Sequence, residues 1–390
     1  MLLPPPLALY VHLPWCLKKC PYCDFNSHAL KEPLPERAYI DAVLADLNST
    51  LLLMSDRPLI SVFIGGGTPS LFSAHALERL LNSLFTYCSH SIEITLEANP
   101  GTVNSETLTA YRRVGINRIS LGIQSFQDDK LKALGRIHDG QTARRAIRLA
   151  KEAGFININL DLMHGLPGQT ITEGLYDLVT ACDFEPTHIS WYQLSLEPNT
   201  WFAHHPPKLP PADQIWDLQD QGASYLAKQG YQHYEISAYA QAGYQCQHNI
   251  NYWQFGDYLG IGAGAHSKLT DCTAQIITRI SKIKHPKDYL TNKYSFIAHA
   301  MTITSHELPF EFMLNHLRLY QNISKITFEE RTGLSYQVLH TPLTEAQEKG
   351  LLAWDHDKIE LTDLGRRFYN DLLLLFMPQT AQDQGRVTMS

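Results

Sequence analysis

The 390-residue sequence has few cysteines, no long apolar run and no excess of positive charge. Its seven cysteines are thinly spread apart from one group of three, which excludes the dense disulfide framework of a small secreted protein. We expect neither a transmembrane helix nor a signal peptide, because long apolar runs and a basic leader are absent. The net charge of −7 provides no general attraction for nucleic acid or anionic membranes. We therefore expect a cytoplasmic protein.

Short apolar runs alternate with helical patterns over residues 1–240, which we predict to be one large domain. The apolar runs predict strands at Leu7–Leu13, Leu59–Ile64, Ile92–Glu97, Ile116–Ile123, Ile156–Met163 and His188–Leu196. The segments between them predict helices at Pro35–Met54, Ala74–Cys88, Ser105–Val114, Gly140–Ala153 and Thr172–Cys182. Ser73 and Ser105 resemble N-caps. Six successive β/α units predict an α/β fold with a parallel sheet, because parallel strands need crossover helices.

The pattern changes after residue 240. Just before that residue, Asp213–Lys228 predicts one more helix and Tyr231–Tyr239 one more strand. Residues 241–300 are predicted to be a linking segment, with a loop up to Ser267. Residues 301–377 predict a second, winged-helix-like domain. Its expected elements are helices at Phe310–Tyr320, Thr327–Arg331 and Tyr336–Lys349, a hairpin at Leu351–Leu361 and a last helix at Asp363–Phe376. The polar residues 378–390 predict a disordered tail.

Polar residues follow five of the predicted strands. They are Gly65–Thr68, Glu97, Gln124, Asp161 and Ser195. In parallel β/α folds the carboxyl ends of the strands face the active site, so we expect these residues to line one pocket. Taken singly, Glu97 and Asp161 are equally well explained as caps of the helices that follow them.

Three cysteines follow the first predicted strand with the spacing C-x3-C-x2-C. Cys16, Cys20 and Cys23 can ligate three irons of a four-iron cluster, and the fourth iron is then left open to another ligand. The amino and carboxylate groups of S-adenosylmethionine (SAM) are suited to that position. The alternative is a zinc site completed by His12 or His28, but structural zinc sites usually have a second pair of ligands, which is missing here.

The cysteine segment resembles the radical SAM motif, with Tyr22 as the aromatic residue that lies against adenine. The resemblance implies a partial (β/α)6 barrel that holds a [4Fe-4S] cluster and SAM. The wider sequence is similar to the group that contains oxygen-independent coproporphyrinogen III dehydrogenases and the heme chaperones of the HemW family. The segments that carry this similarity are Tyr10–Cys16, Gly65–Ser70, Glu97–Gly101, Gly122–Phe126, Leu160–Pro167, Gln247–Trp253 and Gly260–His266.

The resemblance also assigns residues to the cofactor. The SAM-binding set is Tyr10, Tyr22, Gly66, Gly67, Thr68, Glu97, Gln124, Arg136, Asp161, Ser195 and His266. A pair of acids suits ribose hydroxyls, and Arg136 suits a carboxylate. The glycines of 260–264 invite comparison with a dinucleotide-binding loop, but they lack its strand–helix context.

His248 is the expected ligand of heme iron. It lies in a His-Asn-Ile-Asn-Tyr-Trp segment that resembles the HNxxYW segment of heme chaperones. Neutral imidazole is a suitable axial ligand. Tyr252, Trp253 and Phe255 are expected to form an aromatic wall beside the porphyrin. Cys246 is the alternative ligand.

The residues after Cys23 favour a chaperone. The related dehydrogenases continue with Gly-Cys, whereas Asp24-Phe25 follows here. The resemblance therefore implies transfer of heme to an acceptor protein of a respiratory complex, and a homodimer. The alternative is an oxygen-independent coproporphyrinogen III oxidase that decarboxylates propionates, so the choice between chaperone and enzyme stays open. A nucleic-acid-binding regulator is disfavoured, because the expected wing is acidic at Asp355, Asp357 and Glu360.

Overall fold

A twelve-stranded sheet dominates the protein, whose computed structural model describes residues 1–53, 57–292 and 294–378. Six strands lie side by side in chain order and run parallel, as the sequence predicted. They are β1 (Leu7–Leu13), β4 (Leu59–Gly66), β5 (Cys88–Ala98), β6 (Arg118–Gln124), β7 (Asn157–His164) and β8 (His188–Gln193). The outermost strands of the sheet do not pair with each other, so the sheet is a partial barrel.

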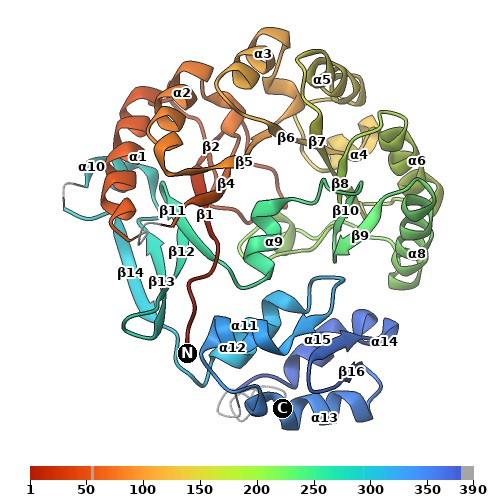
Figure 1. Ribbon diagram of the computed structural model, residues 1–390. Coiled ribbons are helices and arrows are strands. Elements are labelled where there is room, and N and C mark those ends of the chain that lie inside the picture. Colours follow the sequence, from red (N-terminus) through yellow and green to blue (C-terminus); the bar gives the residue numbers. More distant parts are fainter. Residues whose placement is uncertain (54–56, 293, 379–390) are drawn as a thin grey trace.

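Amphipathic helices cover the outer side of this sheet (Figure 1). They include α1 (Glu36–Leu51), α2 (Ala74–Asn82), α3 (Ser105–Arg113), α5 (Gly140–Glu152), α6 (Ile171–Cys182) and α8 (Ala212–Lys228). Ser73 caps α2 by accepting a hydrogen bond from the Ala76 amide, as predicted. Ser105 does not cap α3, because Asn104 forms a reciprocal capping box with Thr107 one residue earlier. Apolar side chains of the helices and strands make one continuous core.

The segment after residue 240 extends the sheet, which the sequence did not predict. β11 (Asp257–Ile261) pairs parallel to β1, and three antiparallel strands follow it. These are β12 (His266–Asp271), β13 (Ile276–Lys282) and β14 (Ile297–Thr302). The expectation of a loop up to Ser267 was wrong, because the strand at 257–261 has only five residues, and being buried along its whole length it has no alternating pattern to recognise.

The opposite edge of the sheet also differs from the prediction. In place of one strand at Tyr231–Tyr239 there are two, β9 (Gln232–Glu235) and β10 (Ala238–Ala240), which form an antiparallel hairpin. β10 then pairs antiparallel with β8. The chain thus turns back at the point where the β/α repeat ends.

A short helix, α9 (Gln247–Trp253), lies within the arc of the strands, where Figure 1 shows it in green at the centre of the molecule. It contacts β1, β4 and β11. Glu93 holds its first turn, because the carboxylate accepts hydrogen bonds from the amides of Gln247 and His248. This helix carries the HNxxYW segment into the interior of the barrel.

The C-terminal part is a winged-helix-like module, shown in blue in Figure 1. Its helices are α11 (Leu308–His316), α12 (Lys325–Thr332), α13 (His340–Glu348), α14 (Asp363–Arg367) and α15 (Tyr369–Leu374), and its small sheet has the order β15 (Ile323–Ser324), β17 (Lys358–Leu361), β16 (Leu352–Trp354). Its core includes Leu2 and Phe255 from the barrel, which join the two parts. Residues 379–390 of the expected tail lie outside the described residues, and the proposed boundaries at 240 and 300 stay predictions.

Every helix in the described part of the chain is too short or too polar to span a bilayer.

Candidate active site

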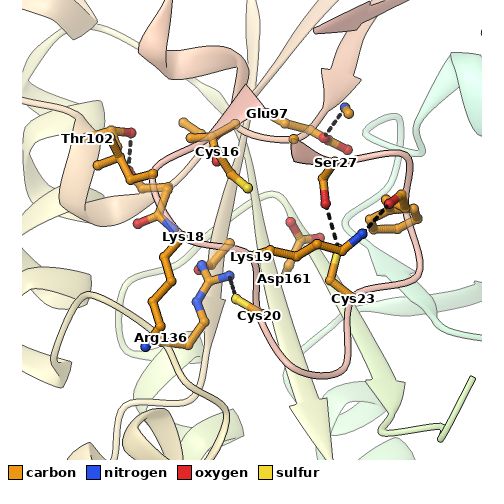
Figure 2. A pocket seen from close by; sticks show the side chains of 18 of the residues that line it. Cys16, Lys18, Lys19, Cys20, Cys23, Ser27, Glu97, Thr102, Arg136 and Asp161 are labelled. Atoms are coloured by element: carbon orange, nitrogen blue, oxygen red, sulfur yellow. Dashed lines mark hydrogen bonds between the residues drawn. The ribbon is translucent and has the colours of Figure 1, made fainter. Parts of the chain in front are cut away.

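The three cysteines lie on a loop at the carboxyl end of β1. β2 (Trp15–Cys16) pairs with β3 (His28–Ala29) and closes the base of this loop. Within it, the Cys23 amide donates to the Cys20 carbonyl at 3.1 Å. Figure 2 shows the three sulfur atoms converging on one space, with Arg136 and Asp161 around it. The loop therefore presents the thiols as one ligand set.

The spacing of the thiols does not suit a single zinc ion. Tetrahedral zinc needs sulfur atoms about 3.8 Å apart. Among the described residues, the one group of three ligating side chains whose atoms all lie within 4.8 Å is Asp355, His356 and Asp357 at an exposed hairpin, and it contains no cysteine. His12, a suggested zinc ligand, is held by the Tyr10 hydroxyl and the Asn26 carbonyl, both at 2.9 Å. The three thiols therefore do not all lie within 4.8 Å of one another, which disfavours one shared zinc ion.

A pocket of about 380 Å³ opens above the cysteine loop. It brings together most of the predicted cofactor residues, namely Cys16, Cys20, Tyr22, Cys23, Gly66, Gly67, Thr68, Glu97, Gln124, Arg136 and Asp161. The structure leaves three predicted residues outside it. Ser195 is exposed beyond the end of β8, whereas Tyr10 and His266 face a second cavity. Ser120 and Tyr192 also line the pocket, although the sequence analysis did not identify them.

Gly66 and Gly67 bring the end of β4 against the cysteine loop. Gly66 has φ +123°, and a Cβ atom there would lie 2.8 Å from the Leu13 carbonyl oxygen. At Gly67 a Cβ atom would lie 2.5 Å from the Trp15 carbonyl oxygen. Only glycine permits this approach. The Gly67 amide donates to the Leu13 carbonyl at 2.8 Å, which ties the two segments together.

Two partly buried carboxyl groups lie across the pocket. Glu97 accepts a hydrogen bond from the Gly66 amide at 3.1 Å, and burial together with the nearby Asp161 raises the pKa of Glu97 to about 8. Burial also raises the pKa of Asp161, which accepts from Ser120 at 2.9 Å and Asn159 at 2.8 Å. Neither acid caps a helix, so the capping alternative does not apply. Both have capacity for further hydrogen bonds to a ligand.

Arg136 provides a partly buried cation beside the Cys20 thiol. One terminal nitrogen donates to the Gly122 carbonyl at 2.6 Å, and the other lies 3.8 Å from the Cys20 sulfur. Its Nε is buried and has no hydrogen-bond partner among the described residues. Buried donors are normally satisfied, so this nitrogen indicates a place for an anionic group.

Gln124 ends β6 in a strained conformation. Its φ of +67° is unusual for a residue with a side chain, and the strand register shifts between Gly122 and Gln124. The Tyr192 hydroxyl donates to its side-chain oxygen at 2.7 Å. Such strain is concentrated at functional sites, where surrounding contacts maintain it.

A second cavity, of about 840 Å³, lies between the barrel and strands β12–β14. Its lining consists of Tyr10, His12, Phe25, Asn26, His248, Tyr252, Tyr258, Gly264, His266, Ser281, Lys282, Lys284, Ala298 and His299. His248 is nearly buried, and its ring lies 5.1 Å from that of Phe63. Its Nδ1 pairs with the Ser61 hydroxyl at 3.2 Å, which leaves Nε2 without a partner in the described part of the chain. Burial lowers the pKa of His248 to about 3, so the imidazole is neutral.

The expected aromatic wall is only partly present. Tyr252 lines the second cavity, but Phe255 is fully buried against Phe312 of the C-terminal module. Trp253 lies under the Arg318 guanidinium, 4.3 Å from the ring centroid. The alternative ligand Cys246 does not line the cavity and lies 3.7 Å from the Glu93 carboxylate. Among the residues of this segment, His248 and Tyr252 face the space.

Comparisons with known proteins agree with this arrangement. The Radical SAM superfamily model matches residues 10–179, and the HemN C-terminal domain model matches residues 303–368. The chain is 51% identical to the heme chaperone HemW of Haemophilus influenzae, over 96% of this chain and 99% of that protein. The heme chaperone HemW of Escherichia coli is 47% identical, again over 96% of this chain and 99% of that protein.

A solved structure shares the fold. Coproporphyrinogen III oxidase (HemN) from Escherichia coli superposes with a TM-score of 0.81, over 96% of this chain and 90% of that chain, at 22% identity. At this identity the likeness concerns the fold alone. The full-length identity to the chaperones is much higher, and it decides the assignment. The chain therefore belongs to the HemW family of heme chaperones within the radical SAM superfamily.

Proposed function

We propose that this chain is a heme chaperone that binds heme, holds a [4Fe-4S] cluster with SAM, and passes heme to an acceptor protein. The observation that carries the proposal is the neutral, unpaired Nε2 of His248 in a cavity separate from the cysteine pocket. It occurs in a chain 51% identical over nearly its whole length to a protein named as a heme chaperone.

The cysteine pocket would hold the cluster and SAM. Cys16, Cys20 and Cys23 are the cluster ligands, as the radical SAM family implies. Arg136 would donate to the carboxylate of SAM. Glu97 and Asp161 would accept hydrogen bonds from its amino and hydroxyl groups. When bound, the cluster supplies an electron to the SAM sulfonium. The residues of the chain bind and orient the cofactor and exclude water from it.

The second cavity would hold heme. Neutral imidazole is the form that ligates iron, and the buried environment of His248 keeps it neutral throughout the physiological range. The hydrogen bond between Nδ1 and Ser61 fixes the ring orientation, as partners of metal-bound histidines commonly do. Heme is the cargo here, so its site needs access to solvent. The exposed residues His266, Lys284 and His299 border the cavity and provide that access.

The alternative, an oxygen-independent coproporphyrinogen III oxidase, is less well supported. Asp24 and Phe25 follow Cys23 where the oxidases have Gly-Cys. We further propose that the acceptor belongs to a respiratory complex and that the chaperone acts in the cytoplasm as a homodimer. Resemblance to the family supports these three statements.

Heme titration and a turnover assay test the function together. Anaerobically reconstituted full-length protein should develop a saturable Soret band with hemin, and the band should weaken in His248→Ala. The loaded protein should release heme to a heme-free globin used as a generic acceptor. Incubation with coproporphyrinogen III, SAM and a reductant should yield no protoporphyrinogen. Formation of that product, or failure to bind hemin, would refute the proposal.

A further inference from the structure

The second cavity has a basic border, and the described residues of its lining include no acidic side chain. Two lysines belong to the lining. The ammonium of Lys282 is buried and paired with Asp46 and Thr50, so it is already neutralised. Lys284 is exposed, and its side chain has no hydrogen-bond or ion-pair partner in the part of the chain that the structure describes. Among the described residues of this border, Lys284 is therefore the free cation, in a protein whose net charge is −7.

The backbone around Lys284 is fixed. The Asn26 side chain donates to the carbonyl oxygens of Lys284 and Ala263, both at 2.9 Å. Asn26 in turn accepts a hydrogen bond from His12 at its own carbonyl oxygen. The Lys284 side chain thus starts from a held position, which reduces the entropy that is lost when it binds a ligand.

Two histidines lie at the same border. His266 and His299 line the cavity, are exposed, and have no hydrogen-bond partner among the described residues. Partial removal from solvent, followed by the positive charges of Arg279 and Lys284, lowers the pKa of His266. The contribution of Lys284 indicates that its ammonium lies near the His266 ring. Neutral imidazole N–H groups and an ammonium are suitable donors for carboxylate oxygens.

The interior of the cavity has a different character. His248 is 9% exposed, and the rings of Tyr10 and Phe63 lie beside it at 6.3 Å and 5.1 Å. A ligand that fits both regions has an apolar body, a group that binds imidazole, and carboxylates along one edge. Heme has all three.

We propose that Lys284, with His266 and His299, binds the propionate carboxylates of heme at the border of the second cavity while the iron lies at His248. The inference rests on the proposed function, because it assigns the orientation of the cargo. It also gives the cargo its exit, since the propionate edge faces solvent and an acceptor.

The assignment is tested by removing the positive charge of Lys284 or by blocking the carboxylates of heme. Hemin and hemin dimethyl ester, in which both carboxylates are blocked, are titrated into the wild type, Lys284→Gln, Lys284→Arg and Lys287→Gln. Lys287 is an exposed lysine three residues away that does not line the cavity. We expect Lys284→Gln to weaken hemin binding by about tenfold and Lys284→Arg to bind like the wild type. The ester should bind the wild type as weakly as Lys284→Gln binds hemin, and Lys284→Gln should not weaken it further.

The outcomes separate this inference from the function itself. Equal affinity of the wild type for hemin and its ester, or an unchanged hemin affinity in Lys284→Gln, would overturn the inference even while the Soret band still depends on His248. The inference would also be overturned if Lys287→Gln bound hemin as weakly as Lys284→Gln does. Hemin affinity would then depend on the overall charge of this surface and not on Lys284 in particular. Absence of hemin binding by the wild type would instead contradict the proposed function.

Discussion

At the scale of single residues, the cysteine thiols are set up to bind metal rather than to react alone. Burial, with Cys23 and Cys20 close by, raises the pKa of Cys16 to about 11, so the free thiol is protonated at neutral pH. Iron of the proposed cluster would therefore have to displace the proton, and assembly of the cluster would release acid.

Each of the three proposed cluster ligands should be indispensable. Cys16→Ala, Cys20→Ala and Cys23→Ala should each lose most of the visible absorption and iron content of the reconstituted protein, because three ligands already leave one iron without a protein sulfur. Cys182→Ala is the matched control, since that thiol is partly buried in the helical layer and far along the chain from the loop. Loss of iron in the control as well would contradict the assignment.

Glu97 should destabilise the cofactor-free protein at high pH. Its pKa is raised from 4.5 to about 8, so the folded state retains a proton that the unfolded state releases. Stability therefore falls as the pH rises from 4.5 to 8. Glu97→Gln should remove this dependence and raise the free energy of unfolding at pH 8 relative to pH 5 by on the order of 2 kcal/mol. Denaturant unfolding at both pH values measures it, with the exposed Glu106→Gln as the control that should show no such difference.

The residues of the cysteine pocket were largely predictable, because the cluster spacing and the polar strand ends are short-range patterns. Ser120 could have been found, since the two-residue period of a strand places it on the same face as Gly122. His266 could not be placed correctly. It follows a glycine turn and begins β12, and pairing with β13 directs it to the other cavity. That pairing is a long-range contact that one sequence does not reveal.

At the scale of elements, the contact between the end of β4 and the cysteine loop is the critical one. Gly67→Ala should destabilise the protein by about 1 to 3 kcal/mol and lower the iron content, because its Cβ would meet backbone atoms of Pro14 and Trp15. Thermal unfolding and iron assays measure the two effects. Gly101→Ala is the control, since its nearest neighbour would lie at 3.4 Å, and a similar loss there would show that the effect is not specific to this contact.

The six parallel strands were predictable because each is an apolar run bounded by turns, and their order followed from the β/α repeat. The strands at the edges were not. β14 is exposed along its whole length, so it has no apolar pattern to recognise, and β9 and β10 are too short for one. Their places depend on pairing with strands distant in the sequence.

At the scale of the whole molecule, Arg318 joins the C-terminal module to the barrel. It pairs with the buried Glu235 of β9 and lies over Trp253 of α9. Arg318→Ala should cost about 2 to 4 kcal/mol, because it leaves a buried carboxylate without its partner. Arg367→Ala removes a pair with Asp220 that crosses the same boundary but is exposed on both sides, and should cost less than about 1 kcal/mol. Chemical denaturation compares them, and equal costs would contradict the role of burial.

Phe25 lines both cavities, just beyond the last cysteine of the loop. The two proposed iron centres would thus be neighbours. The reductant that charges the cluster would also reduce the porphyrin iron, and unpaired electrons on a high-spin ferrous porphyrin would then broaden the electron paramagnetic resonance signal of the reduced cluster. The spectrum of the cluster would therefore report whether the second cavity holds heme.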